Sequence, residues 1–251
     1  MVKVAAVQIS GYDKGELPRD EFDPSGKLVP CIDRAGRDGA QLVVFPEYVL
    51  GHIEVPGPAT KPISEAARAN SIYVIVGCWE ESGDGTFANV ALVFGRNGEI
   101  IGRYRKTHPA IDHFEGHDPW KRPPLGKSRR WMLEHDPEWT MQAGDDLPVF
   151  ELDFGRVGIM TCYDGWFPEL PRVLSLRGAE LIVWINGRRG TVEDFNRCPM
   201  RHFTWAVVAL PLDLSSPIFL NRAAAASREH ESSTLPGLLG LNQANASVDF
   251  A

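Results

Sequence analysis

The sequence has little of what marks metal-ribbon, disulfide-rich, membrane-spanning or nucleic-acid-binding proteins. Its four cysteines are widely spaced and form no CxxC pair, so neither a zinc ribbon nor a disulfide framework is predicted. No run approaches the roughly 18 to 20 consecutive apolar residues of a membrane span. Lys and Arg number 26 against 33 Asp and Glu, and the net charge of −7 argues against nucleic acid or a membrane surface as the main partner.

The residues that are present are typical of one compact soluble domain, or at most two. The 251 residues are 43% hydrophobic and 24% charged, which excludes a collagen-like, coiled-coil or wholly disordered chain. The first ten residues alternate and then reach Gly11 and Asp13 without a long apolar region, so we interpret them as a strand and not as a signal peptide. We therefore expect a cytoplasmic protein that acts on a small molecule.

Strand and helix patterns alternate along most of the chain, which predicts an α/β fold. We expect strands at 4–9, 41–45, 72–76, 89–94, 99–105, 158–161 and 181–185, and helices at 24–38, 63–70 and from Pro168 to about Gly178. Asn97-Gly98 lies between two of these strands and predicts a hairpin. The last two strands and the helix between them form a βαβ unit.

Two segments break this alternation. Residues 107–142 are rich in His, Pro, Trp and charge and have no sustained period, which is typical of a functional or disordered loop. Residues 196–251 have few charges and contain four consecutive alanines, and only 205–210 there resembles a strand. We therefore divide the chain into a domain at 1–195 and a C-terminal segment at 196–251.

Cys162 is the candidate nucleophile because it lies at the end of a predicted strand and directly before a predicted helix. The N-terminus of a helix favours a nearby thiolate, which is the nucleophilic form of cysteine. An isolated cysteine is more commonly a small buried hydrophobe. We interpret Cys31, Cys78 and Cys198 in that way because they lack such a setting.

Two charged residues also end predicted strands. Glu47 follows the strand at 41–45, at the strand end where open α/β folds place ligands. Burial there would raise the pKa of Glu47 toward the working range of a general base. The alternative is an ordinary exposed glutamate at a strand end. Lys106 follows the strand at 99–105. It belongs either to a solvated basic turn or to a site where its ammonium group meets negative charge on a substrate oxygen.

Five stretches carry a family resemblance in their order along the chain: VAAVQIS, LVVFPEY, YVIVGCWEE, FANVALVFGRNGEIIGRYRKTHP and GRVGIMTCYDGWFPELPRVLSLRGAELIVWING. From residue 2 to about 194 the sequence resembles the nitrilase, or carbon–nitrogen hydrolase, superfamily. The resemblance implies an α-β-β-α sandwich and a catalytic triad at Glu47, Lys106 and Cys162. It also implies a second glutamate before the cysteine, for which Glu138 is the best match and Glu134 the alternative.

The residue types of this triad imply a thiol hydrolase that needs neither a metal nor an organic cofactor. The Cys162 thiolate would attack an amide, carbamoyl or nitrile carbon while Glu47 takes the thiol proton and passes it to the departing nitrogen. Lys106 and the backbone N–H of Tyr163 would stabilise the oxyanion, and Glu138 would orient the substrate or Lys106. We expect a linear amide or N-carbamoyl substrate, with a nitrile as the nearest alternative.

Two further groups of residues remain open to other interpretations. His108, His113 and His117 form a candidate zinc cluster, but the nearby Pro and Gly residues disfavour the helix that would align them. Aromatic residues would line a substrate pocket, with Trp166 as our candidate substrate contact, or would belong to the core and to interfaces: Trp120, Trp131, Trp139, Trp166 and Phe167.

The C-terminal segment at 196–251 does not resemble the usual continuation of the superfamily. We therefore expect the second sheet to be incomplete, with unpaired strand edges that promote association. The family suggests a homodimer or a higher homo-oligomer. A catalytically silent binding or scaffold protein is the alternative to an enzyme.

Overall fold

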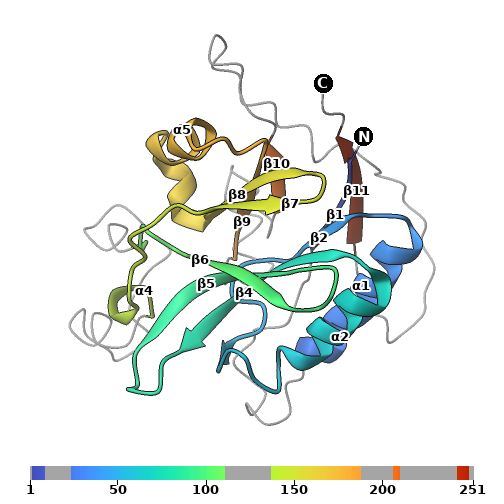
Figure 1. The fold of residues 1–251 in the computed structure, drawn as a ribbon. Coiled ribbons are helices and arrows are strands. Elements are labelled where there is room, and N and C mark those ends of the chain that lie inside the picture. The colour runs from blue at the N-terminus through green and yellow to red at the C-terminus, as the bar shows by residue number, and fades with distance from the viewer. Residues whose placement is uncertain (1, 9–23, 111–136, 188–205, 210–241, 249–251) are drawn as a thin grey trace, which may run out of the picture.

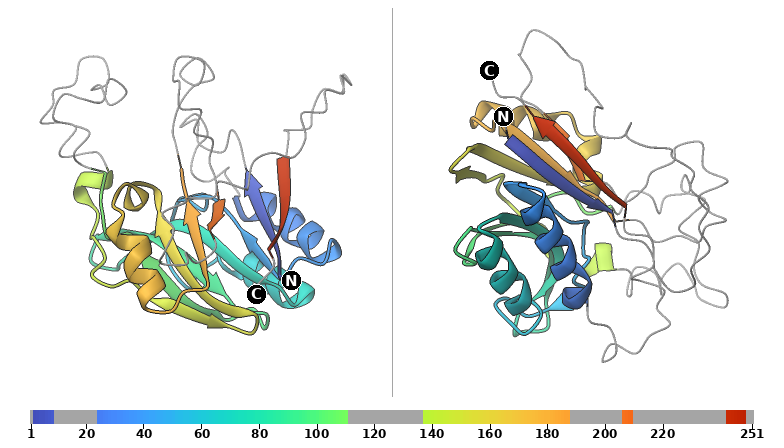
Figure 2. Two further views of the ribbon diagram at one scale, coloured as in Figure 1. Left: turned by 90° about the horizontal axis from the view of Figure 1, so that it is seen from above. Right: turned by 90° about the vertical axis from the view of Figure 1, so that its right-hand side faces the viewer.

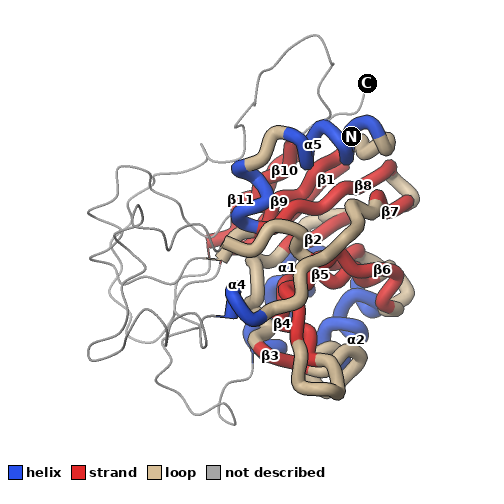
Figure 3. The backbone as a smooth tube through the Cα atoms, turned by 90° about the vertical axis from the view of Figure 1, so that its left-hand side faces the viewer, coloured by secondary structure: helices blue, strands red, loops and turns tan. Residues whose placement is uncertain are grey.

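Two β-sheets lie face to face and are covered by helices on their outer faces. The computed structural model describes residues 2–8, 24–110, 137–187, 206–209 and 242–248. Helices α1 (Pro24–Arg37) and α2 (Lys61–Asn70) cover one sheet, and α5 (Glu169–Leu176) covers the other (Figure 1). Two further views show the same succession of layers (Figure 2), and α5 and α2 lie at opposite ends of the stack (Figure 3). The predicted α-β-β-α sandwich is confirmed.

The first sheet has seven strands, of which six follow the order β11-β1-β2-β4-β5-β6 and β3 pairs separately with β4. The pairs β1–β2 and β2–β4 are parallel, and the pairs β11–β1, β4–β5 and β5–β6 are antiparallel. The strands are β1 (Val2–Gln8), β2 (Leu42–Val44), β3 (His52–Ile53), β4 (Tyr73–Glu81), β5 (Phe87–Phe94), β6 (Ile100–Arg105) and β11 (Asn242–Val248).

The second sheet has four strands in the order β10-β9-β8-β7. These are β7 (Val149–Leu152), β8 (Gly155–Thr161), β9 (Leu181–Ile185) and β10 (Ala206–Ala209). The strands β8 and β9 are parallel and are joined through the 3₁₀ helix η3 (Cys162–Trp166) and α5, which confirms the predicted βαβ unit.

Side chains of successive strand residues alternate between two layers of core. On β4, Val74 and Val76 pack against α1 and α2, whereas Tyr73 and Ile75 pack between the two sheets. This alternation follows from the two-residue period of a strand, and it explains why the central strands are nearly continuous apolar runs. The sheets are therefore held together by burial on both faces.

The structure confirms most of the predicted elements and shifts their ends. The helix expected at Pro168 begins at Glu169, with Pro168 in the cap position before it. Residues 107–142 were expected to hold no regular element, but α4 (Pro137–Thr140) forms one helical turn there. None of the described helices combines the length and apolar character that crossing a bilayer requires.

Within the described residues, the second sheet has four strands, and the C-terminal segment contributes to both sheets. The strand predicted at 205–210 is β10, which pairs with β9 along four residues and adds the fourth strand to that sheet. A second strand from the same segment, β11, was not predicted and pairs with β1 in the first sheet along seven residues. Residues from 196–251 thus contribute a strand to each sheet.

Candidate active site

Glu47 lies in a buried turn directly after β2. Its carboxylate is fully shielded from solvent, which excludes the exposed strand-end interpretation. The Glu47 Oε1 accepts a hydrogen bond from Asn89 Nδ2 at 2.6 Å, and Oε2 accepts one from the Gly187 backbone N–H at 2.7 Å. Donors from both sheets therefore fix the orientation of this carboxylate, because Asn89 is on β5 and Gly187 follows β9.

Lys106 follows β6 and is also fully buried, so the interpretation as a solvated basic turn is wrong for this residue. Its backbone N–H donates to the Asn89 carbonyl at 2.8 Å, which continues the antiparallel pairing of β6 with β5. Its ammonium Nζ donates to Glu47 Oε1 at 3.2 Å. A buried ammonium group requires such partners because an unpaired charge in the interior is very costly.

Glu138 supplies the second carboxylate. It lies on α4, and its two oxygens accept hydrogen bonds from Lys106 Nζ at 2.9 and 3.0 Å. The Glu138 Oε2 also accepts from the Ala110 backbone N–H at 2.9 Å. Lys106 is thus held between Glu47 and Glu138. Glu134, the alternative for this position, lies outside the described residues.

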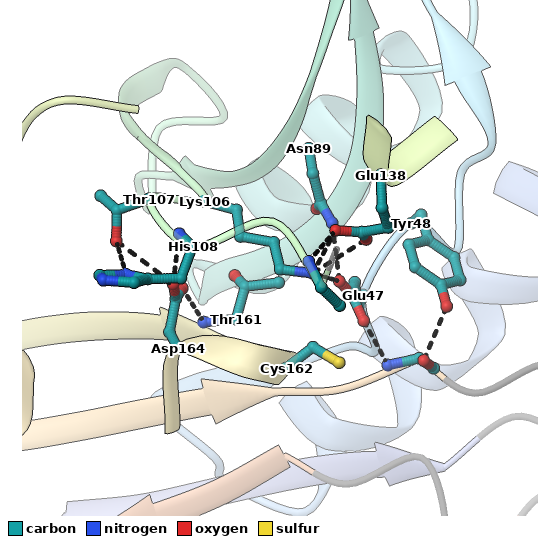
Figure 4. Close-up of polar contacts among 12 residues, drawn as sticks. Glu47, Tyr48, Asn89, Lys106, Thr107, His108, Glu138, Thr161, Cys162 and Asp164 are labelled. Carbon is teal, nitrogen blue, oxygen red and sulfur yellow. Dashed lines mark hydrogen bonds and ion pairs between the residues drawn. The ribbon is translucent and has the colours of Figure 1, made fainter. Parts of the chain in front are cut away.

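Cys162 begins η3 at the turn between β8 and α5. Its φ of 46° lies in the left-handed region, where a non-glycine residue costs of order 1–3 kcal/mol and needs support from its surroundings. Part of that support comes from Trp184 on β9, whose Nε1–H donates to the Cys162 carbonyl at 2.9 Å. The sulfur points toward Glu47, and Lys106 and Glu138 lie beyond it (Figure 4). The Cys162 residue as a whole has an intermediate exposure to solvent.

The pKa values of Glu47 and Lys106 are set by burial and by their mutual charges. Burial raises the pKa of Glu47, and the charge of Glu138 adds to this, while Lys106 and the hydrogen bond from Asn89 oppose it. Burial alone would lower the pKa of Lys106, but the charges of Glu47 and Glu138, together with the hydrogen bonds to Glu138, raise it overall. Lys106 therefore carries a positive charge, and Glu47 has the raised pKa that suits a general base.

The expectation that the helix would favour a resting Cys162 thiolate is wrong. Desolvation and the neighbouring charge of Glu47 raise the pKa of the Cys162 thiol, and the opposing effect of Lys106 is smaller. The first element after Cys162 is a short 3₁₀ helix and not an α-helix, so the dipole that a longer helix would supply is weak here. The raised pKa disfavours the thiolate, so a reaction at this sulfur would require a base within reach.

The described aromatic candidates differ in their exposure to solvent. Tyr163 is buried and its ring contacts both Trp166 and Phe167. The Trp166 side chain is 62% exposed, so it lies at the surface beside the turn. Trp139 is partly buried on α4. Two further candidates, Trp120 and Trp131, lie outside the described residues.

The zinc-cluster hypothesis finds no support in the part of the chain that is described. His108 stacks on Phe167, with ring centroids 4.3 Å apart, and its Nδ1 lies 2.9 Å from Thr107 Oγ1. His113 and His117 lie outside the described residues. Among the described residues, no group of three or more His, Cys, Asp or Glu side chains has the arrangement of a metal site.

Sequence reasoning missed three residues that hold the site together. Asn89 is a buried amide in the otherwise apolar strand β5, and such a polar residue in a buried strand was the available signal. Gly187 donates its N–H to Glu47, but no side-chain pattern marks a backbone donor. Asp164 is a fully buried carboxylate two residues after Cys162, and its position in the CYD element was the signal.

Comparison with known sequences gives one family and related enzymes. A family model described as carbon-nitrogen hydrolase matches residues 3–235. Omega-amidase NIT2-B of Xenopus laevis is 31% identical over 172 residues, which are 64% of this chain and 57% of that protein. A nitrilase of Pyrococcus abyssi is 31% identical over 198 residues, which are 73% of this chain and 64% of that protein. The chain thus spans less than two thirds of the length of these relatives.

Solved structures share the fold. An amidase from Nesterenkonia sp. has a TM-score of 0.57 at 17% identity, covering 84% of this chain and 82% of that one. Saccharomyces cerevisiae Nit3 has a TM-score of 0.58 at 18% identity, with coverage of 84% and 82%. At these identities the likeness shows the fold alone. Because the family model covers residues 3–235, most of the chain, the protein belongs to the carbon–nitrogen hydrolase family.

Proposed function

We propose that the protein is a thiol hydrolase that cleaves a linear carbon–nitrogen bond other than a peptide bond. The observation that carries this proposal is the meeting of Cys162, Glu47 and Lys106 at the ends of three strands that are far apart in the sequence. A protonated thiol, a buried carboxylate with a raised pKa and a charged ammonium group form a nucleophile, a base and an electrostatic stabiliser.

In the first half of the reaction, Glu47 takes the Cys162 thiol proton as the sulfur attacks the carbonyl carbon. The raised pKa of the thiol makes this transfer necessary, because little thiolate is present before the substrate binds. Negative charge then develops on the substrate oxygen, where Lys106 Nζ and the backbone N–H of Tyr163 stabilise it. Glu47 returns its proton to the nitrogen, the C–N bond breaks, and a thioester with Cys162 remains.

In the second half, Glu47 accepts a proton from water as the water attacks the thioester carbon. The tetrahedral intermediate collapses, the C–S bond breaks and the thiol regains the proton, which releases the acid. Glu138 keeps the Lys106 ammonium group in position through its two hydrogen bonds of 2.9 and 3.0 Å. The chemistry of both halves is supplied by side chains and water.

We propose an amide or an N-carbamoyl compound as the substrate. The relatives named as omega-amidases favour this class, and the raised pKa of Glu47 suits proton delivery to an amine leaving group. A nitrile is the second candidate, and the relative named as a nitrilase favours it. The two candidates differ in whether the nitrile or only the corresponding amide releases ammonia.

The test is ammonia release from a panel of short amides, N-carbamoyl amino acids and nitriles. We expect turnover of an amide or a carbamoyl compound, loss of turnover in Cys162→Ala, and a loss of about 10²–10⁴-fold in Glu47→Gln. Cys31→Ala is the matched control because Cys31 is buried in α1, away from the site. A Cys162 acyl adduct should also appear by intact mass spectrometry after acid quenching.

Two results would overturn the proposal. If the folded wild-type protein releases no ammonia from any compound of the panel, the result favours a catalytically silent binding or scaffold protein. If a chelator abolishes turnover while Cys162→Ala preserves it, the reaction uses a metal. Circular dichroism of each protein shows whether it is folded.

A further inference from the structure

Asp164 has a buried carboxylate that the proposed reaction does not use. It is fully shielded from solvent and accepts hydrogen bonds at both oxygens. Oδ2 accepts from the Thr161 N–H at 2.9 Å and from the Tyr104 hydroxyl at 2.6 Å. Oδ1 accepts from the backbone N–H of His108 at 3.0 Å and from the Thr107 hydroxyl at 3.2 Å. Each buried oxygen thus has two donors, which is what a desolvated carboxylate requires.

These donors come from two different sheets. Thr161 is the last residue of β8 in the second sheet. Tyr104 lies on β6 in the first sheet, and Thr107 and His108 follow that strand. Asp164 therefore connects the end of β8, which Cys162 follows, to the end of β6, which Lys106 follows (Figure 4).

The connection is adjacent to both reacting groups along the chain. The Thr161 N–H belongs to the residue before Cys162, and Thr107 follows Lys106 directly. Cys162 has an unfavourable left-handed backbone conformation with a φ of 46°, and such conformations persist only where surrounding contacts hold them. Asp164 supplies one of those contacts, and the Trp184 hydrogen bond to the Cys162 carbonyl supplies another.

We propose that Asp164 is a positioning residue that joins the nucleophile turn to the end of β6 and so holds the Cys162 sulfur where Glu47 and Lys106 can act on it. The inference rests on the function proposed above, in which Glu47 must reach the thiol proton. A displacement of about 1 Å at a reacting group can cost about 10²-fold in rate, so loss of this connection should lower the rate of chemistry more than substrate binding.

Tyr104 gives the sharpest variant because it contributes a single hydroxyl to the connection. Burial raises the pKa of the Tyr104 hydroxyl, and the charge of Asp164 adds to this, so the group acts as a neutral donor. Tyr104→Phe removes that donor and leaves the other three donors to Asp164. It also removes the hydroxyl that accepts from the Thr107 backbone N–H at 3.4 Å. Asp164→Asn is more severe, since an amide N–H at Oδ2 would face the Thr161 N–H.

Tyr73→Phe is the matched control. Tyr73 is a buried tyrosine of the first sheet, like Tyr104, and its hydroxyl accepts a hydrogen bond from the Asp153 N–H at 3.3 Å. It pairs with Leu42 at the beginning of β2, whereas Glu47 follows the other end of that strand. The control therefore removes the same atom from the same sheet without touching the connection at Asp164.

The experiment measures two rates in the full chain. The first is the rate at which iodoacetamide alkylates Cys162, located by peptide mass mapping across a pH series; it reports how readily the thiol gives up its proton. The second is kcat and KM for the amide that the wild-type protein hydrolyses best. Urea unfolding of each variant shows how much of any change is due to stability.

We expect Asp164→Asn to lower both the alkylation rate and kcat by about 10- to 100-fold, with KM changing less than about threefold. Tyr104→Phe should lower them by about 3- to 10-fold, less than Asp164→Asn because three of the four donors to Asp164 remain. Tyr73→Phe should match the wild-type protein at similar stability. The proposal is overturned if the folded Tyr104→Phe and Asp164→Asn variants have the same alkylation rate and kcat as the wild-type protein. If Asp164→Asn does not fold, Tyr104→Phe alone decides.

Failure of the proposed function would give a different pattern. If neither the wild-type protein nor any variant hydrolyses an amide, the alkylation rates still report the reactivity of Cys162. Slow alkylation in Tyr104→Phe and a wild-type rate in Tyr73→Phe would then support the positioning role without hydrolysis. Equal alkylation rates in the two variants would overturn it.

Discussion

In the proposed reaction, the protonation state of Glu47 decides whether it can accept the thiol proton of Cys162. Burial and Glu138 raise its pKa, while Lys106, Asn89 and Gly187 lower it. A general base works best when its pKa is near the operating pH, so each of these neighbours adjusts the pH range of activity. Substitutions of two of them should move that range in opposite directions.

Asn89→Ala should move the acidic limb of the kcat/KM profile to higher pH. The substitution removes a hydrogen bond that lowers the pKa of Glu47. With a higher pKa, Glu47 stays protonated to higher pH and cannot take the thiol proton. We expect kcat/KM near neutral pH to fall about 10-fold, as for loss of a hydrogen bond to a charged group. Asn70→Ala is the control, because Asn70 on α2 donates a hydrogen bond to Asp33 on α1. An acidic limb that stays at the wild-type pH in Asn89→Ala would contradict the prediction.

Glu138→Gln should move the same limb to lower pH. The charge of Glu138 raises the pKa of Glu47, so a neutral amide of similar shape lowers it and Glu47 ionises at lower pH. We also expect kcat to fall by about 10-fold or more, because Lys106 loses a charged partner. The pH profile is measured beside that of Asn89→Ala. A limb that moves upward in both variants would show that Glu138 acts by packing and not by charge.

At the scale of elements, the turn that carries Glu47 lies directly against β4. An added Cβ at Gly77 would lie 2.5 Å from the Tyr48 N and 2.6 Å from the Glu47 Cα and the Pro46 carbonyl oxygen. These are backbone atoms and cannot move aside as a flexible side chain would. The absence of a side chain at Gly77 is therefore what allows the turn after β2 to bring Glu47 into the interior.

Gly77→Ala should both destabilise the protein and impair the reaction. Forcing a methyl group into this contact should cost about 1–3 kcal/mol of the free energy of unfolding and displace Glu47. Gly83→Ala is the matched control, because a Cβ there would meet no atom within 4 Å, and its effect should stay within about 0.5 kcal/mol. Urea unfolding and ammonia release measure the two effects. Equal stability of both variants would contradict this account of the turn.

The elements with strong local patterns were predictable from sequence. The β5–β6 hairpin follows from Asn97-Gly98, and Gly98 has the positive φ of 83° that such a turn requires. The helix α4 was missed because four residues are too short to show a helical period. The strand β11 was missed because its sequence, NQANASV, is polar and poor in β-forming residues.

The site was predictable only where a motif marks a reacting side chain. The resemblance led to Glu47, Lys106, Cys162 and Glu138, and the structure brings these four side chains together. It could not reveal that Asp164 receives donors from both sheets, since that contact exists only when the sheets face each other. The protonated state of Cys162 also depends on burial, which no local pattern shows.

At the scale of the whole molecule, the first sheet is completed by the two ends of the described chain. The strand β11 pairs antiparallel with β1 from Val2 opposite Val248 to Gln8 opposite Asn242. The pairing covers one edge of β1, whose other edge pairs with β2, the strand that leads to Glu47. An uncovered β-strand edge is a template for pairing with another molecule.

Removal of residues 242–251 should therefore lower stability and promote association. Loss of the β11 pairing should cost at least about 1 kcal/mol, which lowers the thermal midpoint by roughly 2–4 °C in a chain of this size. The freed edge of β1 should also make the molecular mass from light scattering rise with protein concentration. Removal of residues 249–251 alone is the control, because it leaves every β11 pair with β1 in place. If the two truncated proteins have the same midpoint and the same mass, β11 does not protect the edge of β1.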